Sequence, residues 1–91
     1  MPKAIQERRQ LAFAKHLVQL GYDVVSLSGG SHGAPALLVG GLDRQGRPQN
    51  VLLLVKTARG RVTKAEADWA LKWRGPFKVV RSLDEAREAV Q

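Results

Sequence analysis

The chain has 91 residues, of which 44% are hydrophobic, and this is enough for one small domain with a single core. Cysteine is absent, which excludes disulfide bonds and thiolate metal sites. The longest apolar run, residues 51–55, is far too short to cross a bilayer. No apolar stretch of signal-peptide type follows the charged N-terminal residues. We therefore expect a single domain over residues 1–91 that is cytoplasmic and does not bind a membrane.

The net charge of +7 is concentrated between Arg44 and Arg81, where ten Lys or Arg residues stand against two acids. Concentrated positive charge is typical of a protein with a polyanionic partner, most often a nucleic acid. The alternative interpretation is that these charges only keep a small surface soluble.

A first helix is predicted over about residues 3–20, which contain neither Gly nor Pro. Gly21 follows at the position where glycine commonly ends a helix. Leu11 and Val18 lie on the outer side of this helix, which is unexpected for a monomer, and we therefore expect a homodimer. The side chains expected to pack on a sheet are Phe13, Leu17 and Leu20.

Strands are predicted at residues 22–27 and 36–39, on either side of a Ser/Gly-rich loop at residues 28–33. Residues 40–48 are rich in turn formers and are interpreted as a turn-rich connection. The continuous apolar run at residues 51–55 is typical of a strand buried on both faces. We expect it to be the most buried element.

A capping box, in which a hydroxyl and a carboxylate each bind a free amide at a helix start, is predicted at Thr63 and Glu66. The helix should run to about residue 74, where a Gly-Pro pair ends it. The face expected to lie in the core carries Ala65, Trp69 and Trp73. At i, i+4 spacing, we interpret the two tryptophans as core residues rather than as surfaces for base stacking.

A fourth strand is predicted at residues 77–80, followed by a second capping box at Ser82 and Glu85. The final helix is expected to turn Leu83, Ala86 and Val90 inward. The complete order is α-β-β-β-α-β-α. A β-hairpin region followed by a β-α-β crossover predicts an α/β fold with a mixed β-sheet flanked by helices.

Several short motifs occur along the chain in a characteristic order. They are GYDVV at residues 21–25, GSHGAPALLV at 30–39, VLLLVKT at 51–57, TKAEADW at 63–69, WRGP at 73–76 and VVRS at 79–82. With the order of the elements, they resemble the restriction-endonuclease-like superfamily, whose motif is written PD-(D/E)xK. The similarity is greatest to the stand-alone VRR-NUC domains of phages and bacteria and to archaeal-type Holliday junction resolvases. It implies a restriction-endonuclease-like fold.

Active members of this superfamily are metal-dependent endodeoxyribonucleases that use Mg²⁺, and the resemblance identifies the positions of their acids. Ala36 stands where they carry the Asp of a Pro-Asp pair, and Leu54 where they carry the Glu of Glu-x-Lys. Gln10 corresponds to a Glu on their first helix. The lysine of the motif is retained as Lys56.

Hydrolysis of a phosphodiester in such a site needs a hard divalent cation held by carboxylate oxygens. Alanine, leucine and an amide cannot supply them, so we expect no metal, no cofactor and no cleavage. Lys56 could still position a phosphate. The alternative is an active Mg²⁺-dependent endonuclease in which Glu66, on the second helix, replaces a missing acid.

Candidate contacts to nucleic acid are Ser31 and His32 in the Ser/Gly-rich loop, together with Arg59, Arg61 and Lys64. The three cations flank the start of the second helix, where a phosphate is readily bound. The predicted function is a catalytically inactive nuclease-fold domain that binds the DNA backbone without sequence readout, and no small-molecule substrate is expected. A further alternative is a structural or engineered scaffold that binds no nucleic acid.

Overall fold

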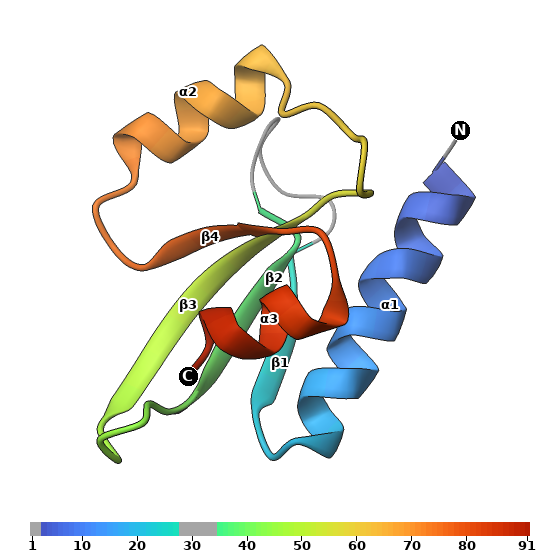
Figure 1. Ribbon diagram of the computed structural model, residues 1–91. Helices are drawn as coiled ribbons and strands as arrows, with labels where there is room; N and C mark the ends of the chain where they lie inside the picture. The colour runs from blue at the N-terminus through green and yellow to red at the C-terminus, as the bar shows by residue number, and fades with distance from the viewer. Residues whose placement is uncertain (1–2, 28–34) are drawn as a thin grey trace.

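The structure, a computed structural model, describes residues 3–27 and 35–91. Its elements follow the predicted order (Figure 1). They are α1 (Lys3–Gln19), β1 (Asp23–Ser26), β2 (Leu37–Leu42), β3 (Pro48–Val55), α2 (Lys64–Lys72), β4 (Phe77–Val80) and α3 (Leu83–Ala89). None of the helices in these two ranges combines the length and the apolar character that crossing a membrane requires.

The four strands form one mixed sheet in the order β1-β2-β3-β4. β1 pairs with β2, and β2 with β3, in antiparallel fashion, whereas β3 and β4 are parallel. A parallel pair cannot be joined by a tight turn, and α2 with its flanking loops makes the crossover. The predicted α/β fold with a mixed sheet is therefore confirmed.

β2 and β3 are both longer than predicted, because the ladder continues through two glycines that were expected in a turn. Gly40 pairs with Asn50, and Gly41 with Gln49. Gly41 also lies against the ring of Tyr22, which a Cβ at this position would overlap. Glycine is thus used here for a close approach between the strand and an aromatic ring, and not for a turn.

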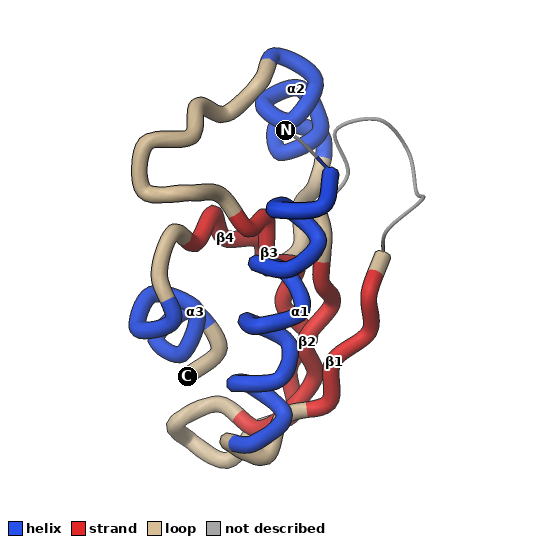
Figure 2. The backbone as a smooth tube through the Cα atoms, turned by 90° about the vertical axis from the view of Figure 1, so that its right-hand side faces the viewer, coloured by secondary structure: helices blue, strands red, loops and turns tan. Residues whose placement is uncertain are grey.

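α1 and α3 lie side by side over one face of the sheet (Figure 2). The core fills the space between these helices and that face. Every residue from Val51 to Val55 in β3 is buried, so this strand is the most buried element, as predicted. The core cluster consists of Phe13, Leu17, Ala36, Leu37, Val39, Val51, Leu53, Val55, Val80, Ala86 and Val90.

Two leucines that were expected in the core are exposed, because each lies at a helix end. α1 ends at Gln19, so Leu20 lies in the following turn and is 46% exposed. Gly21 completes that turn with a φ of +99°, which favours glycine, as predicted. Leu83 is the first residue of α3 and is 39% exposed.

α2 lies over the opposite face of the sheet. The strand register places Leu52, Leu54 and Phe77 on this face, and the ring of Phe77 stacks with that of Trp69 in α2. However, α2 has no buried residue, and Trp73 at its C-cap is 46% exposed. The expectation that both tryptophans lie in the core is therefore wrong: they form a separate aromatic cluster at the surface.

The two predicted capping boxes differ in how completely they form. At α2, Thr63 and Glu66 make both hydrogen bonds of the capping box, as predicted. At α3, the Ser82 hydroxyl accepts from the amide of Glu85 at 3.1 Å. The Glu85 carboxylate, however, accepts from the amide of Arg81 rather than from that of Ser82, so the second box is only half formed.

Candidate functional site

Three of the positions identified from the sequence come together at the carboxyl end of β3. Lys56 continues this strand, because its amide donates to the Val80 carbonyl at 3.0 Å. Alternation along the strand places the Lys56 side chain on the same face as Leu54, which is the face that α2 covers. Ala36 directly precedes β2 and donates its amide to Leu53 at 3.1 Å. It therefore lies beside Leu54 across the ladder.

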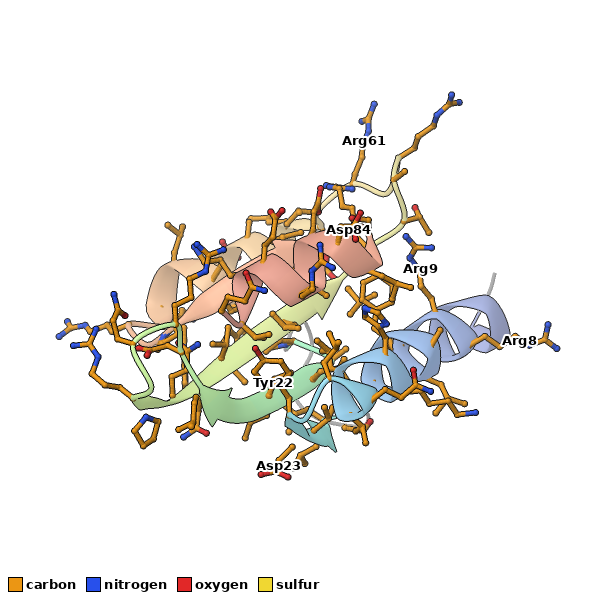
Figure 3. The ribbon with its side chains drawn as sticks, turned by 60° about the horizontal axis from the view of Figure 1, so that its bottom comes forward. Arg8, Arg9, Tyr22, Asp23, Arg61 and Asp84 are labelled. Atoms are coloured by element: carbon orange, nitrogen blue, oxygen red, sulfur yellow. The ribbon has the colours of Figure 1, made fainter. Side chains whose placement is uncertain are left out.

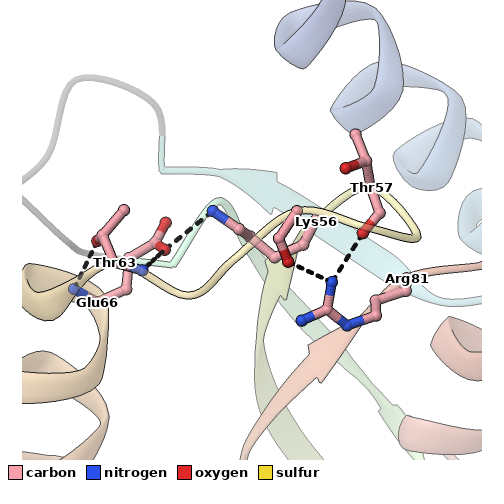
Figure 4. Close-up of polar contacts among 6 residues, drawn as sticks. Lys56, Thr57, Thr63, Glu66 and Arg81 are labelled. Carbon is pink, nitrogen blue, oxygen red and sulfur yellow. Dashed lines mark hydrogen bonds and ion pairs between the residues drawn. The ribbon is translucent and has the colours of Figure 1, made fainter.

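An ion pair joins this end of β3 to the start of α2 (Figure 4). Lys56 Nζ lies 2.9 Å from Glu66 Oε1, and the two side chains are only 12% and 15% exposed. The same oxygen accepts a hydrogen bond of 2.9 Å from the amide of Thr63. Glu66 thus has two roles: it caps the N-terminus of α2, and it neutralises the charge of Lys56.

The protonation state of Glu66 follows from these contacts. Burial raises the pKa of Glu66, but the hydrogen bonds from the Thr63 amide and from Lys56 outweigh it, so the pKa lies below its ordinary value. The carboxylate is therefore ionised near neutral pH. It faces the ammonium of Lys56, which is consequently not an uncompensated positive charge.

The three positions at which the resemblance predicts missing acids carry side chains without charge. Leu54 is 4% exposed and Ala36 is 7% exposed, so both are packed against neighbouring groups. Gln10 is partly exposed on α1, the helix that lies over the opposite face of the sheet. Within the described ranges, no three His, Cys, Asp or Glu side chains gather as a metal site would require.

Two arginines hold the segment that follows β3. Arg9 of α1 donates to the carbonyls of Lys56 and Arg81, at 3.1 and 2.6 Å. Arg81 donates in turn to the carbonyls of Thr57 and Gly60, at 2.8 and 2.5 Å (Figure 4). Sequence analysis did not identify these roles, because Arg9 and Arg81 are 72 positions apart and no local pattern signals the contact.

The basic segment of the sequence does not form one surface. Arg44 and Arg47 lie near the turn between β2 and β3, whereas Arg59, Arg61 and Lys64 follow the other end of β3. β3 has eight residues, which is a length of roughly 25 Å. The two groups lie at its opposite ends, which can be followed in Figure 1. We refer to Arg59, Arg61 and Lys64 as the loop cations.

The loop cations differ from the arginines at the opposite end in how they are paired. All three are exposed, and Arg61 extends away from the body of the protein (Figure 3). Among the residues described, no carboxylate forms an ion pair with any of them. Arg47, by contrast, lies 3.5 Å from the carboxylate of Asp43. The loop cations are therefore available to an anion.

The N-terminus of α2 is already occupied by the protein's own groups. Thr63 Oγ1 accepts from the amide of Glu66 at 3.1 Å, and the Glu66 carboxylate stands at the same helix end. A negative charge placed there already meets the helix dipole. Any phosphate would therefore be bound by the side chains of the loop cations rather than by helix amides. Ser31 and His32, the other candidate contacts, lie outside the described residues.

Comparisons of the chain with models of protein families, with curated proteins and with solved structures gave no match. The structure by itself defines the class of the protein as an α/β domain with a four-stranded mixed sheet.

Proposed function

We propose that this chain is a nuclease-fold domain that has lost metal-dependent cleavage and binds the backbone of DNA without sequence readout. The observation that carries the proposal is the group of three loop cations, exposed and without a carboxylate partner among the described residues. They lie next to the end of β3, where the resemblance to PD-(D/E)xK nucleases would place an active site.

The fold supports the nuclease resemblance without being specific to it. The α-β-β-β-α-β-α order and the mixed sheet agree with what that superfamily implies. Lys56 and Leu54 lie at one end of β3 on the face covered by α2, and Ala36 lies beside Leu54 directly before β2, with its side chain in the core cluster. The positions that the resemblance assigns to the motif lysine and to two of the missing acids are therefore neighbours, which supports the proposal.

Loss of cleavage follows from the chemistry of the side chains at this end of β3. A Mg²⁺ ion needs anionic oxygen ligands to offset its dehydration. Leu54 and Ala36 offer none, and the one nearby carboxylate, Glu66, is engaged through Oε1 by both Lys56 and the Thr63 amide. If Glu66 acted instead as a displaced metal ligand, its ion pair with Lys56 would have to break and the N-terminal cap of α2 would be disturbed.

Binding to the backbone follows from the kind of contact that the loop cations can make. Arginine and lysine side chains on an exposed loop attract phosphates and release counterions, which gives affinity without reading the bases. α2, the helix beside them, has the sequence KAEADWALK and therefore carries no Asn, Gln or Arg that could read base edges.

The proposal is tested by a salt-dependent DNA-binding titration combined with a cleavage assay in Mg²⁺ and Mn²⁺ on the same labelled duplex. We expect binding that weakens steeply with salt, and an intact duplex in both metals. Binding that is absent at low salt would favour a scaffold that does not interact with nucleic acid. Cleavage that disappears in a Glu66→Gln variant would instead show an active nuclease.

A further inference from the structure

Three aromatic rings form a continuous stack at the surface, at the end of α2 that lies away from the loop cations. The ring centroids of Trp69 and Trp73 are 5.1 Å apart with an interplanar angle of 24°. Those of Trp69 and Phe77 are 5.9 Å apart at 28°. Phe77 belongs to β4 and is partly buried, so it anchors the stack to the sheet, while Trp73 forms its outer end.

The outer ring of this stack, that of Trp73, is more exposed than it would need to be if it only anchored α2 to the sheet. Trp73 is 46% exposed, although an indole contributes most to stability when it is buried. Its position is fixed by the protein: its amide donates to the Ala70 carbonyl as the C-cap of α2. Gly75 lies so close that a Cβ there would come within 2.9 Å of Trp73 Nε1. A large aromatic surface is thus held in place and left open to solvent.

The charges around the stack indicate what could cover it. Lys72 and Arg74 flank Trp73 in the sequence, and both are exposed. No carboxylate in the described ranges forms an ion pair with either. The other large apolar side chain of α2, Leu71, lies two residues from Trp69, about 200° around the helix, and so belongs to a different face. An aromatic surface between cations complements a ligand that has flat rings and negative charge.

The loop cations and this stack are joined by α2 itself. The helix has nine residues and is therefore about 14 Å long, a length that a short single strand can span. A strand could thus contact cations at both ends of α2 and reach the aromatic rings at its C-terminal end.

We propose that Trp69, Trp73 and Phe77 form a stacking platform for an unpaired base of single-stranded nucleic acid, whose phosphates contact the cations at the two ends of α2. This inference rests on the proposed function and gives it a substrate class. Stacking on aromatic side chains tolerates any base, which agrees with binding without sequence readout. A base inside a duplex cannot reach the platform, because both of its faces are covered by neighbouring base pairs.

The experiment uses the intrinsic fluorescence of the protein. Trp69 and Trp73 are the two tryptophans of the chain, so the whole tryptophan signal comes from the proposed platform. The protein is titrated with a single-stranded oligonucleotide, with an abasic strand of equal length and charge, and with a duplex. We expect quenching by the single strand and at least about fivefold weaker binding of the abasic strand, as expected for the loss of one stacked base.

Two variants separate stacking from folding. Trp73→Leu should weaken binding of the single strand by about fivefold or more and leave duplex binding unchanged, whereas Trp73→Phe, which keeps an aromatic face, should retain most of the affinity. The folded state of both is checked by thermal unfolding. The abasic comparison uses the unaltered protein, so it remains decisive if Trp73→Leu does not fold.

Equal affinity for the normal and abasic strands, with unchanged fluorescence, would overturn the stacking platform while leaving backbone binding intact. A fluorescence change on simple dilution, without nucleic acid, would also overturn it, because the platform would then be covered by a second copy of the chain. Absence of binding to any of the three ligands at low salt would reject the proposed function itself.

Discussion

The ammonium of Lys56 lies 2.9 Å from the carboxylate of Glu66, in an environment where the two side chains are only 12% and 15% exposed. The pair joins β3 to α2, a helix that has no buried residue of its own. Together with the aromatic stack at the other end of the helix, it fastens α2 to the sheet. Lys56 thus has a structural partner within the protein.

Removing one member of this pair should destabilise the fold. Lys56→Met leaves Glu66 largely buried without its counter-ion, and we expect a loss of about 1–3 kcal/mol in the free energy of unfolding, between the values for exposed and fully buried pairs. Lys72→Met, which alters an exposed lysine on α2, is the matched control and should change the free energy of unfolding by less than about 0.5 kcal/mol. Urea unfolding of both variants measures the difference. Equal stability of Lys56→Met and the parent would show that the pair contributes nothing.

The contribution of the pair should depend on pH in a direction set by Glu66. Its pKa in the folded state lies below its ordinary value, which is about 4.3 in an unfolded chain. The stability that it contributes is therefore complete above that value and is lost as the pH falls through the lower pKa of the folded state. The stability difference between the parent and Glu66→Gln should be constant from neutral pH down to about pH 5 and shrink below it. A difference that grew on acidification would contradict the assignment.

If Ala36 and Leu54 stand where the nuclease resemblance places two acids, then introducing those acids should create a metal site at the expense of stability. Leu54 and Ala36 are buried, so Ala36→Asp combined with Leu54→Glu buries two carboxylates. We expect a loss of roughly 3–5 kcal/mol without metal and partial recovery of the unfolding temperature in Mn²⁺, because an ion that binds only the folded state stabilises it.

The matched control for this variant is Ala36→Asp combined with Leu52→Glu. Leu52 is 6% exposed and lies on the same face of β3 as Leu54, but two residues further from Lys56. This control variant should be destabilised to a similar extent, but its unfolding temperature should not recover in Mn²⁺. If both variants, or neither, respond to the metal, then Ala36 and Leu54 do not stand at inherited ligand positions.

A homodimer is expected through the outer side of α1. Leu11 and Val18 are 55% and 56% exposed, as the sequence predicted. With the edge strand β1 they border a shallow, mostly apolar groove, lined by Leu11, Ala14, Lys15, Val18, Gln19 and Val24. Exposed apolar surface of this kind is typical of a protein–protein contact.

Sedimentation of the parent and of a Leu11→Ser, Val18→Ser variant tests this interface. We expect the parent to sediment as a dimer at high micromolar concentration and the variant as a monomer. Leu71→Ser, which alters a residue that is 85% exposed on α2, should leave the dimer intact. A monomeric parent would contradict the prediction. A dimer that persists in the double variant would indicate another interface, such as domain swapping through the turn-rich loops.

Sequence patterns predicted the elements well where the signal is local. The continuous apolar run of β3 identified the most buried strand, and Thr63 with Glu66 identified the start of α2. Predictions that depend on where a helix ends relative to the sheet were less accurate, as the exposed Leu20 and Leu83 show. A residue just beyond a helix end no longer follows the spacing of about 100° per residue, so its side chain need not lie on the apolar face.

The candidate site was predictable in its positions but not in its contacts. Ala36, Leu54 and Lys56 were identified together from the resemblance to a nuclease motif, and they are neighbours in the structure. The partner of Lys56 was not foreseen, since Glu66 already had a local explanation as a capping residue. The role of Arg9 could not be foreseen either, because it donates to backbone carbonyls, which carry no sequence signal.

The salt dependence of DNA binding in two double variants tests the proposed function most directly. Replacing Arg59 and Arg61 by Ala removes two exposed cations, while replacing Arg44 and Arg47 by Ala removes equal charge at the opposite end of β3. We expect the slope of log affinity against log salt to shrink by about 1.8 units in the first variant, or about 0.9 for each phosphate that is no longer neutralised, and to stay unchanged in the second. Slopes that equal the parent's in both variants would contradict DNA binding by the loop cations.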